Sequence, residues 1–91
     1  MSYTALWIAM WQQALKDETR QAYRCIRQEL QQQGYSNHRI AKAVTLIKDD
    51  IKQKVAQNIM FEYDRYPYNP ERCYKYYELS QKAARQTGGR K

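Results

Sequence analysis

Hydrophobic residues between Asn37 and Tyr63 recur at steps of three and four, the spacing that places side chains on one face of an α-helix. The apolar positions are Ile40, Val44, Ile47, Ile51, Val55 and Ile59. The positions on the other side are charged: Lys42, Asp49, Lys52 and Lys54. Because no glycine or proline interrupts this run, the pattern predicts one continuous amphipathic helix from Asn37 to about Tyr63.

An apolar stripe with the same spacing precedes this segment. It consists of Ile8, Trp11, Leu15, Ala22, Ile26 and Leu30, with Thr19 in the gap. The stripe predicts a helix from about Thr4 to Gln33, with Gly34 as the residue that ends it. Ser36 or Asn37 is a suitable N-cap for the next helix. A connection this short predicts that the two helices are antiparallel neighbours.

A third helix is expected from about Pro70 to Arg85. Pro67 disfavours helical geometry at Tyr66, and Asn69-Pro70 is typical of a helix start. No alternating strand pattern occurs. We therefore expect an all-α fold, either a three-helix bundle or a long antiparallel helical hairpin with a shorter third helix. Residues 1–86 would form one domain, and residues 87–91 a flexible basic tail.

The net charge of the chain indicates what kind of molecule it binds. The chain has 16 basic and 9 acidic residues, a net charge of +7, and most of the excess lies after residue 35. A basic protein favours acidic partners, namely nucleic acid, an anionic membrane or an acidic protein. The apolar segment from Tyr3 to Trp11 is too short to span a bilayer. It is expected to be a buried helix start or, alternatively, a membrane-surface segment anchored by Trp7 and Trp11.

Neither the cysteines nor the titratable residues indicate catalysis. Cys25 and Cys73 lie outside any CxxC pattern and are too few for a four-ligand zinc site, so we expect free thiols in a reducing compartment. A Cys25–Cys73 bridge in an oxidising compartment is the alternative. His38 has no evident catalytic partner, and the adjacent Asp49 and Asp50 diverge on a helix. We expect no enzyme activity, no catalytic residues, no metal and no cofactor.

A helix-turn-helix is the alternative interpretation of the middle of the chain. In GYSNHRIAKAV the apolar spacing approximates that of a DNA-reading helix pair. A second helix would then begin near Lys48 and offer lysines to phosphates. Two features oppose this hypothesis: Thr45 stands where the tight turn favours glycine, and the apolar stripe continues through the supposed turn.

The segment FEYDRYPYNPERCYKYY combines tyrosines with basic residues. Such a mixture is typical of protein interfaces, and it can also stack bases and bind phosphates. We favour a protein interface and single out Tyr66, Tyr68 and Arg72 as candidate partner-binding residues.

Residues 22–84 resemble the LYR-motif family, small basic three-helix proteins of mitochondria. The resemblance lies in Ala22-Tyr23-Arg24-Cys25-Ile26-Arg27, in Ile47-Lys48-Asp49-Asp50-Ile51-Lys52, and in Asn69-Pro70 at the start of a third helix. Ala22 stands where the family has leucine, and Ile51 where it usually has an aromatic residue. The resemblance implies an adaptor that docks the acidic mitochondrial acyl carrier protein. It also implies that Tyr23, Arg24, Arg27, Arg39 and Lys48 contact the partner.

The function expected from the sequence is therefore that of a non-catalytic adaptor or accessory subunit of a larger assembly, such as a respiratory or assembly complex. If the resemblance holds, the protein acts on the matrix side of mitochondria; otherwise a cytoplasmic location is expected. The alternative is a small basic nucleic-acid-binding protein resembling helix-turn-helix regulators.

Overall fold

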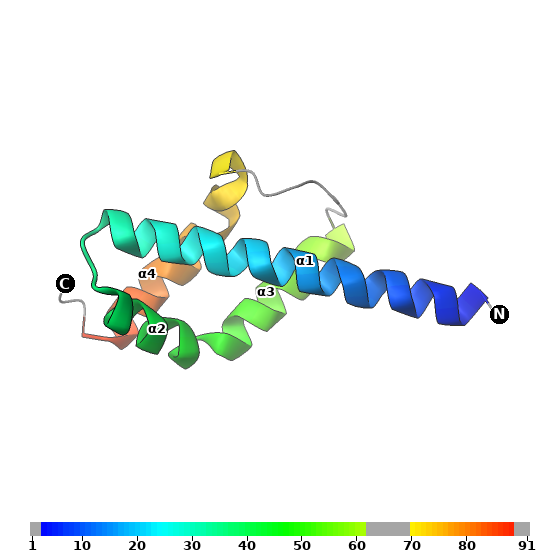
Figure 1. The fold of residues 1–91 in the computed structure, drawn as a ribbon, viewed down its shortest axis with the longest axis horizontal. Coiled ribbons are helices and arrows are strands. Elements are labelled where there is room, and N and C mark those ends of the chain that lie inside the picture. Colours follow the sequence, from blue (N-terminus) through cyan, green and yellow to red (C-terminus); the bar gives the residue numbers. More distant parts are fainter. Residues whose placement is uncertain (1–2, 62–69, 89–91) are drawn as a thin grey trace.

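The computed structural model describes residues 3–61 and 70–88, and all of its regular elements are helical (Figure 1). These are α1 (Tyr3–Gln32), α2 (Asn37–Leu46), α3 (Lys48–Phe61), the 3-10 helix η1 (Pro70–Tyr76) and α4 (Tyr77–Gln86). The described residues contain no strand. The all-α fold predicted from the sequence is therefore confirmed.

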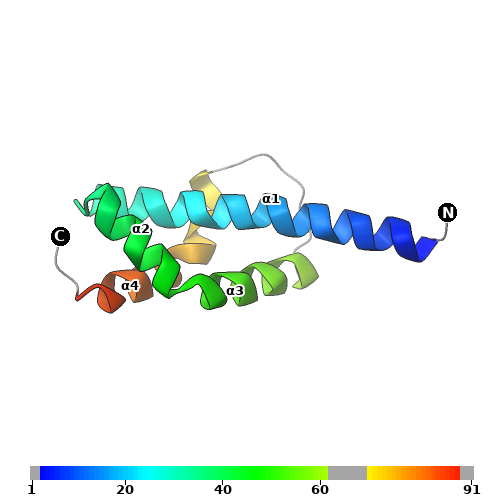
Figure 2. The ribbon, with the colours of Figure 1, turned by 60° about the horizontal axis from the view of Figure 1, so that its bottom comes forward.

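Helix α1 is the element on which the others assemble. It packs against α2, α3, η1 and α4, and α4 also packs against α2 (Figure 2). The molecule is elongated, with principal extents of 51 × 24 × 20 Å. The N-terminal part of α1 projects beyond the end of the bundle (Figure 1).

The turn between α1 and α2 follows the sequence prediction. Gly34 adopts a φ of 93°, a left-handed conformation that glycine adopts without strain. The N–H of Tyr35 donates to the carbonyl oxygen of Leu30 at 3.1 Å. Ser36 is the N-cap of α2, because its side chain accepts a hydrogen bond from the N–H of Arg39 at 3.3 Å. These contacts reverse the chain so that α2 lies back against α1.

The prediction of a single helix from Asn37 to Tyr63 was wrong. The segment divides at Ile47, which has φ −109° and ψ 20°, and α3 begins at the next residue. Ile47 is nevertheless buried, with 1% of its surface exposed. The bend allows α2 to pack against both α1 and α4, while α3 follows α1. A break of one residue keeps the spacing of three and four, so the apolar pattern does not reveal it.

The third predicted helix begins at Pro70, as expected, but its first part is the 3-10 helix η1. Asn69, expected at the start of this helix, lies outside the described residues, as do the last three residues of the predicted tail. At the end of α4 the N–H of Thr87 bonds to the carbonyl oxygen of Ala83 at 3.3 Å.

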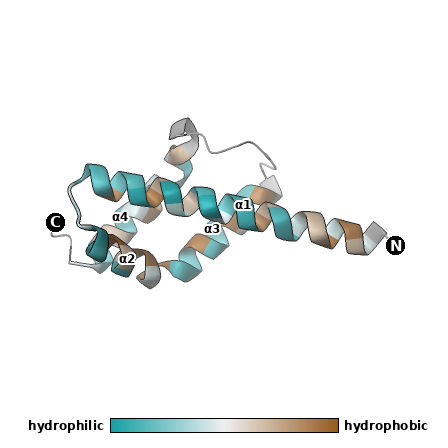
Figure 3. Cartoon of the chain, viewed as in Figure 1, coloured by the Kyte–Doolittle hydropathy of each residue, from teal (hydrophilic) through white to brown (hydrophobic). Residues whose placement is uncertain are grey.

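The core lies between α1 and the helices packed against it. Hydrophobic residues recur along the helices (Figure 3), and those of the core cluster come from α1, α2, α3, η1 and α4. The largest fully buried apolar or aromatic side chains are Tyr76, Ile26, Leu30, Ile47, Ile51 and Val55. Both apolar stripes recognised in the sequence thus contribute to one core.

Candidate functional site

The apolar end of α1, defined here as residues 4–10, is exposed along its whole length. Its large side chains have exposed fractions of 50% for Leu6, 65% for Trp7, 46% for Ile8 and 43% for Met10. Consecutive residues of a helix point about 100° apart, so these four side chains span roughly 200° of the circumference of α1, and Ala5 and Ala9 lie on the remaining side. A helix that is apolar on all sides is typical of a buried environment. The isolated chain leaves this segment without that environment.

The apolar end also lacks charge and is continuous with the core. No Asp, Glu, Lys or Arg occurs between Tyr3 and Leu15. The rings of Trp7 and Trp11 stack with centroids 5.9 Å apart and planes 8° apart, and Trp11 packs against the core. The favoured expectation that this helix start is buried is therefore wrong for residues 4–10, since only Trp11 reaches the core. The sequence could not show that the covering helices end before α1 does.

Two predicted partner-binding residues, Arg24 and Arg27, are exposed on the solvent side of α1, with Tyr23 half-buried beside them. Lys16 and Arg20 extend this side toward the apolar end, and the sequence analysis missed both. Their steps of three and four residues from Arg24 and Arg27 were the signal that could have identified them.

The other predicted residues are placed differently. Lys48 is exposed at the start of α3, on a different helix from Arg24 and Arg27. The guanidinium of Arg39 donates from Nη2 to the carbonyl oxygen of Thr87 at 3.1 Å, so Arg39 joins α2 to the end of α4. Tyr66 and Tyr68 lie outside the described residues, and so does the side chain of Arg72.

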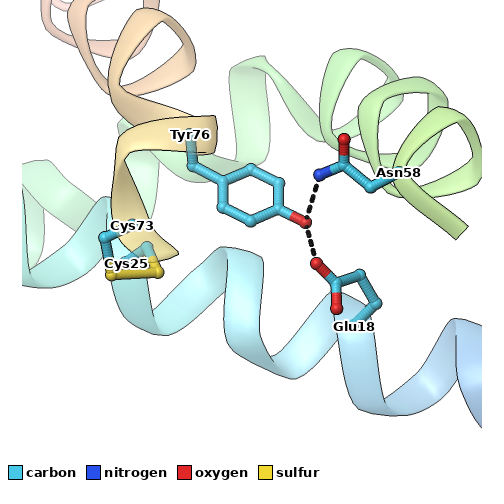
Figure 4. The surroundings of a disulfide bond; sticks show 5 residues. All are labelled: Glu18, Cys25, Asn58, Cys73 and Tyr76. Atoms are coloured by element: carbon cyan, nitrogen blue, oxygen red, sulfur yellow. Dashed lines mark hydrogen bonds between the residues drawn. A yellow bond between two sulfur atoms is a disulfide. The ribbon is translucent and has the colours of Figure 1, made fainter. Parts of the chain in front are cut away.

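Cys25 of α1 and Cys73 of η1 form a disulfide, so the expectation of free thiols was wrong (Figure 4). Their Cα atoms lie 5.1 Å apart, within the range of native disulfides. Because 48 positions separate the two cysteines in the sequence, their proximity could not be recognised from the sequence alone. The bond fixes η1 against the C-terminal half of α1.

Beside the disulfide, Tyr76 joins three helices (Figure 4). Its hydroxyl donates to Oε1 of Glu18 on α1 and accepts a hydrogen bond from Nδ2 of Asn58 on α3 at 2.9 Å. Tyr76 is 1% exposed, so both hydrogen bonds lie at a buried ring. This network positions the start of α4 relative to both long helices.

Replacing Tyr76 with phenylalanine is expected to lower the free energy of unfolding by about 2 kcal/mol, because Asn58 and Glu18 lose a buried partner. Urea unfolding followed by circular dichroism measures this change. Tyr74→Phe is the matched control, since Tyr74 is 71% exposed and its substitution should change stability by less than about 0.5 kcal/mol. Equal stabilities of the two variants would contradict the network.

A cavity of about 210 Å³ opens next to the disulfide. It is lined by Cys25, Glu29, Cys73, Tyr74, Tyr76, Tyr77 and Ser80. This volume is below the 300–1,000 Å³ that is typical of small-molecule pockets. Among residues 3–61 and 70–88 no group of three or more His, Cys, Asp or Glu side chains is placed to hold a metal ion. No helix in the same part of the chain is long and apolar enough to cross a membrane.

Comparison with family models, curated proteins and solved structures finds no match to this chain. The resemblance of residues 22–84 to LYR-motif proteins therefore stays a prediction that rests on the residues themselves.

Proposed function

We propose that this protein is a non-catalytic adaptor or accessory subunit that docks an acidic protein partner through α1. The observation that carries this proposal is the apolar end of α1, which is exposed on every side and carries no charge. Contiguous exposed apolar surface on a small domain is typical of a protein-binding site. A partner with an apolar groove would bury the side chains of this segment, which the helices of the bundle leave exposed.

Burial of this segment against a partner would contribute favourably to binding. Complete burial of a Leu, Ile or Met side chain contributes about 1.5–3 kcal/mol relative to full exposure, and here roughly half of each is available. Tryptophan is among the residue types that most often dominate binding energy at interfaces. We therefore assign the anchoring contact to Trp7, supported by Leu6 and Ile8.

Charge sets the expected character of the partner. Arg24 and Arg27 are exposed farther along the same helix, and the whole chain carries a net charge of +7. Complementary acidic groups on a partner would accelerate association and fix its orientation along α1. An acyl carrier protein in a mitochondrial assembly is the partner that the LYR resemblance suggests.

The disulfide bears on the compartment in which the adaptor acts. Disulfides persist in oxidising compartments and are rare in reducing ones. Action on the matrix side of mitochondria, or in the cytoplasm, thus entails that Cys25 and Cys73 are reduced there. Trapping the thiols with a mass-shifting alkylating agent directly from cells distinguishes the two states.

One feature of the fold agrees with the helix-turn-helix alternative, and the packing of its two helices does not. The break at Ile47 starts α3 at Lys48, as that hypothesis requires. However, α2 packs mainly on α1 and α4, α3 packs on α1, and Leu46 at the bend is 52% exposed. Helices of a helix-turn-helix pack against each other around their turn. This packing does not favour DNA recognition by α3.

The docking test compares two variants of the tagged, nuclease-treated chain in a native pull-down with mass spectrometry. Leu6→Ser combined with Trp7→Ser should lower recovery of an acidic protein partner at least tenfold, because truncating a central anchor costs about 2 kcal/mol or more. Leu46→Ser is the matched control, because this leucine is 52% exposed on α2, away from the apolar end.

Recovery of the acidic partner with the control but not with the double variant supports the proposal. Detection of an acyl–phosphopantetheine group on that partner would identify it as an acyl carrier protein. Equal recovery with both variants, or recovery of no protein with either, would contradict docking through the apolar end.

A further inference from the structure

The cavity beside the disulfide brings aromatic rings and a carboxylate together. Tyr74 of η1, Tyr77 of α4 and Glu29 of α1 all line it. The two tyrosines are 71% and 52% exposed, so a ligand can reach their rings from solvent. Among the described residues that line the cavity, Glu29 is the one that carries a charge.

Glu29 makes the cavity locally negative in a chain that is basic as a whole. Its Oε1 accepts a hydrogen bond from Nε2 of Gln33 at 2.9 Å, and because this donor is neutral, the carboxylate keeps its charge. Glu29 is half-buried, so salt screens its charge less than that of a fully exposed group. Lys75 follows Tyr74 in the sequence but is not among the residues that line the cavity. The electrostatics of the cavity therefore favour a cation.

The tyrosine rings strengthen this preference. The face of an aromatic ring is negative and attracts a cation within about 6 Å of the ring centroid. A cavity of about 210 Å³ is small enough that a cation inside it lies close to each of the walls. Aromatic rings grouped around one site are a known means of recognising quaternary ammonium groups.

The walls also select the kind of cation. A primary ammonium or a guanidinium carries N–H donors, and a donor that loses water without gaining an acceptor costs free energy. Three tyrosines and the disulfide form most of the lining, and ring carbon and sulfur are poor acceptors. A quaternary ammonium has no N–H to satisfy. The volume is too small for a drug-sized ligand and suits a compact ion such as choline.

Hydrogen bonds and the disulfide hold these walls in place. The disulfide joins α1 to η1, and the buried Tyr76 is bonded through its hydroxyl to Glu18 and Asn58 (Figure 4). Ser80 is 0% exposed, and its Oγ donates to the carbonyl oxygen of Tyr77 at 2.6 Å. A site with ordered walls loses less conformational entropy when a ligand binds.

We propose that this cavity binds a quaternary ammonium group, with the cation against the rings of Tyr74 and Tyr77 and paired with the carboxylate of Glu29. This site goes beyond docking of an acidic protein. It does not rest on that function either, because none of its residues belongs to the apolar end of α1.

The test is a titration of the purified, oxidised full chain with choline at constant ionic strength, followed by NMR of the tyrosine ring protons. Two accessible rings and one carboxylate predict saturable binding with a Kd of about 1–10 mM. The neutral alcohol 3,3-dimethylbutan-1-ol has the shape of choline with carbon in place of nitrogen, and it should bind at least about tenfold more weakly. Equal binding of the two compounds, or no saturation by about 50 mM choline, would overturn the proposal.

Two pairs of variants assign the contacts. Tyr74→Leu combined with Tyr77→Leu should weaken choline binding at least about tenfold, whereas Tyr74→Phe combined with Tyr77→Phe, which keeps both rings, should change it less than about threefold. Glu29→Gln should weaken binding at least about threefold. Its matched control is Glu78→Gln, an exposed carboxylate of α4 that does not line the cavity, which should leave binding unchanged.

Circular dichroism should show that all four variants keep their helices. Equal weakening by Glu29→Gln and Glu78→Gln would overturn the proposal, because binding would then follow net charge alone. Full binding by the leucine pair would overturn it as well. Sedimentation with phosphatidylcholine vesicles identifies the source of the group: sedimentation that the leucine pair abolishes supports a lipid headgroup, and choline binding without sedimentation supports a free compound.

Discussion

Reduction of the Cys25–Cys73 disulfide is expected to lower the free energy of unfolding by about 4 kcal/mol at 25 °C. The bond joins positions 48 residues apart, and a cross-link over such a loop restricts the unfolded chain strongly. Small domains are stable by about 5–15 kcal/mol, so this loss is a large fraction of the total. Urea unfolding with and without a phosphine reductant measures it.

The control for the disulfide is the double variant Cys25→Ser, Cys73→Ser, whose stability should not respond to the reductant. A thiol count on the denatured, unreduced protein should detect no free cysteine. Two free thiols, together with unfolding midpoints that are the same with and without reductant, would contradict the bond.

Replacing Ile51 with alanine is expected to lower the free energy of unfolding by about 3 kcal/mol. Ile51 of α3 is 0% exposed in the core, and removing a buried aliphatic side chain leaves a cavity as well as reducing apolar burial. Leu46→Ala is the matched control at the bend between α2 and α3. Because Leu46 is 52% exposed, its replacement should change stability by less than about 0.5 kcal/mol.

This pair of variants tests the inward face of the bent α2–α3 segment. Chemical unfolding of both proteins under the same conditions gives the comparison. If Leu46→Ala were as destabilising as Ile51→Ala, Leu46 would be buried and the two helices would be rotated from the positions described.

The helices themselves could be predicted from the apolar stripes, because burial of one face depends on a spacing that the sequence displays. The turn at Gly34 and Ser36 was also predictable, since those residue types have specific backbone and capping roles. The bend at Ile47 was not, because it accompanies the packing of α2 on α4, a contact between distant segments that the local pattern does not display. The pairing of Cys25 with Cys73 depends on tertiary proximity in the same way.

The role of the candidate partner-binding residues stays a prediction. Arg24 and Arg27 are exposed, whereas the guanidinium of Arg39 bonds to Thr87 within the chain. The sequence shows that the stretch up to Leu15 carries no charge. It does not show where along α1 the other helices cease to cover it. Exposure of Trp7 follows from the relative lengths of helices, a property that an apolar pattern does not encode.

The most direct test of the proposed adaptor function is site-specific photo-cross-linking in cells, with a photoreactive residue at position 6 and, as the control, at position 46. Both leucines are exposed, at 50% and 52%, but only Leu6 belongs to the apolar end of α1. The proposed function predicts a cross-link from position 6 to an acidic protein, and none to that protein from position 46. Cross-links from position 6 to lipid alone, or no protein cross-link from either position, would contradict it.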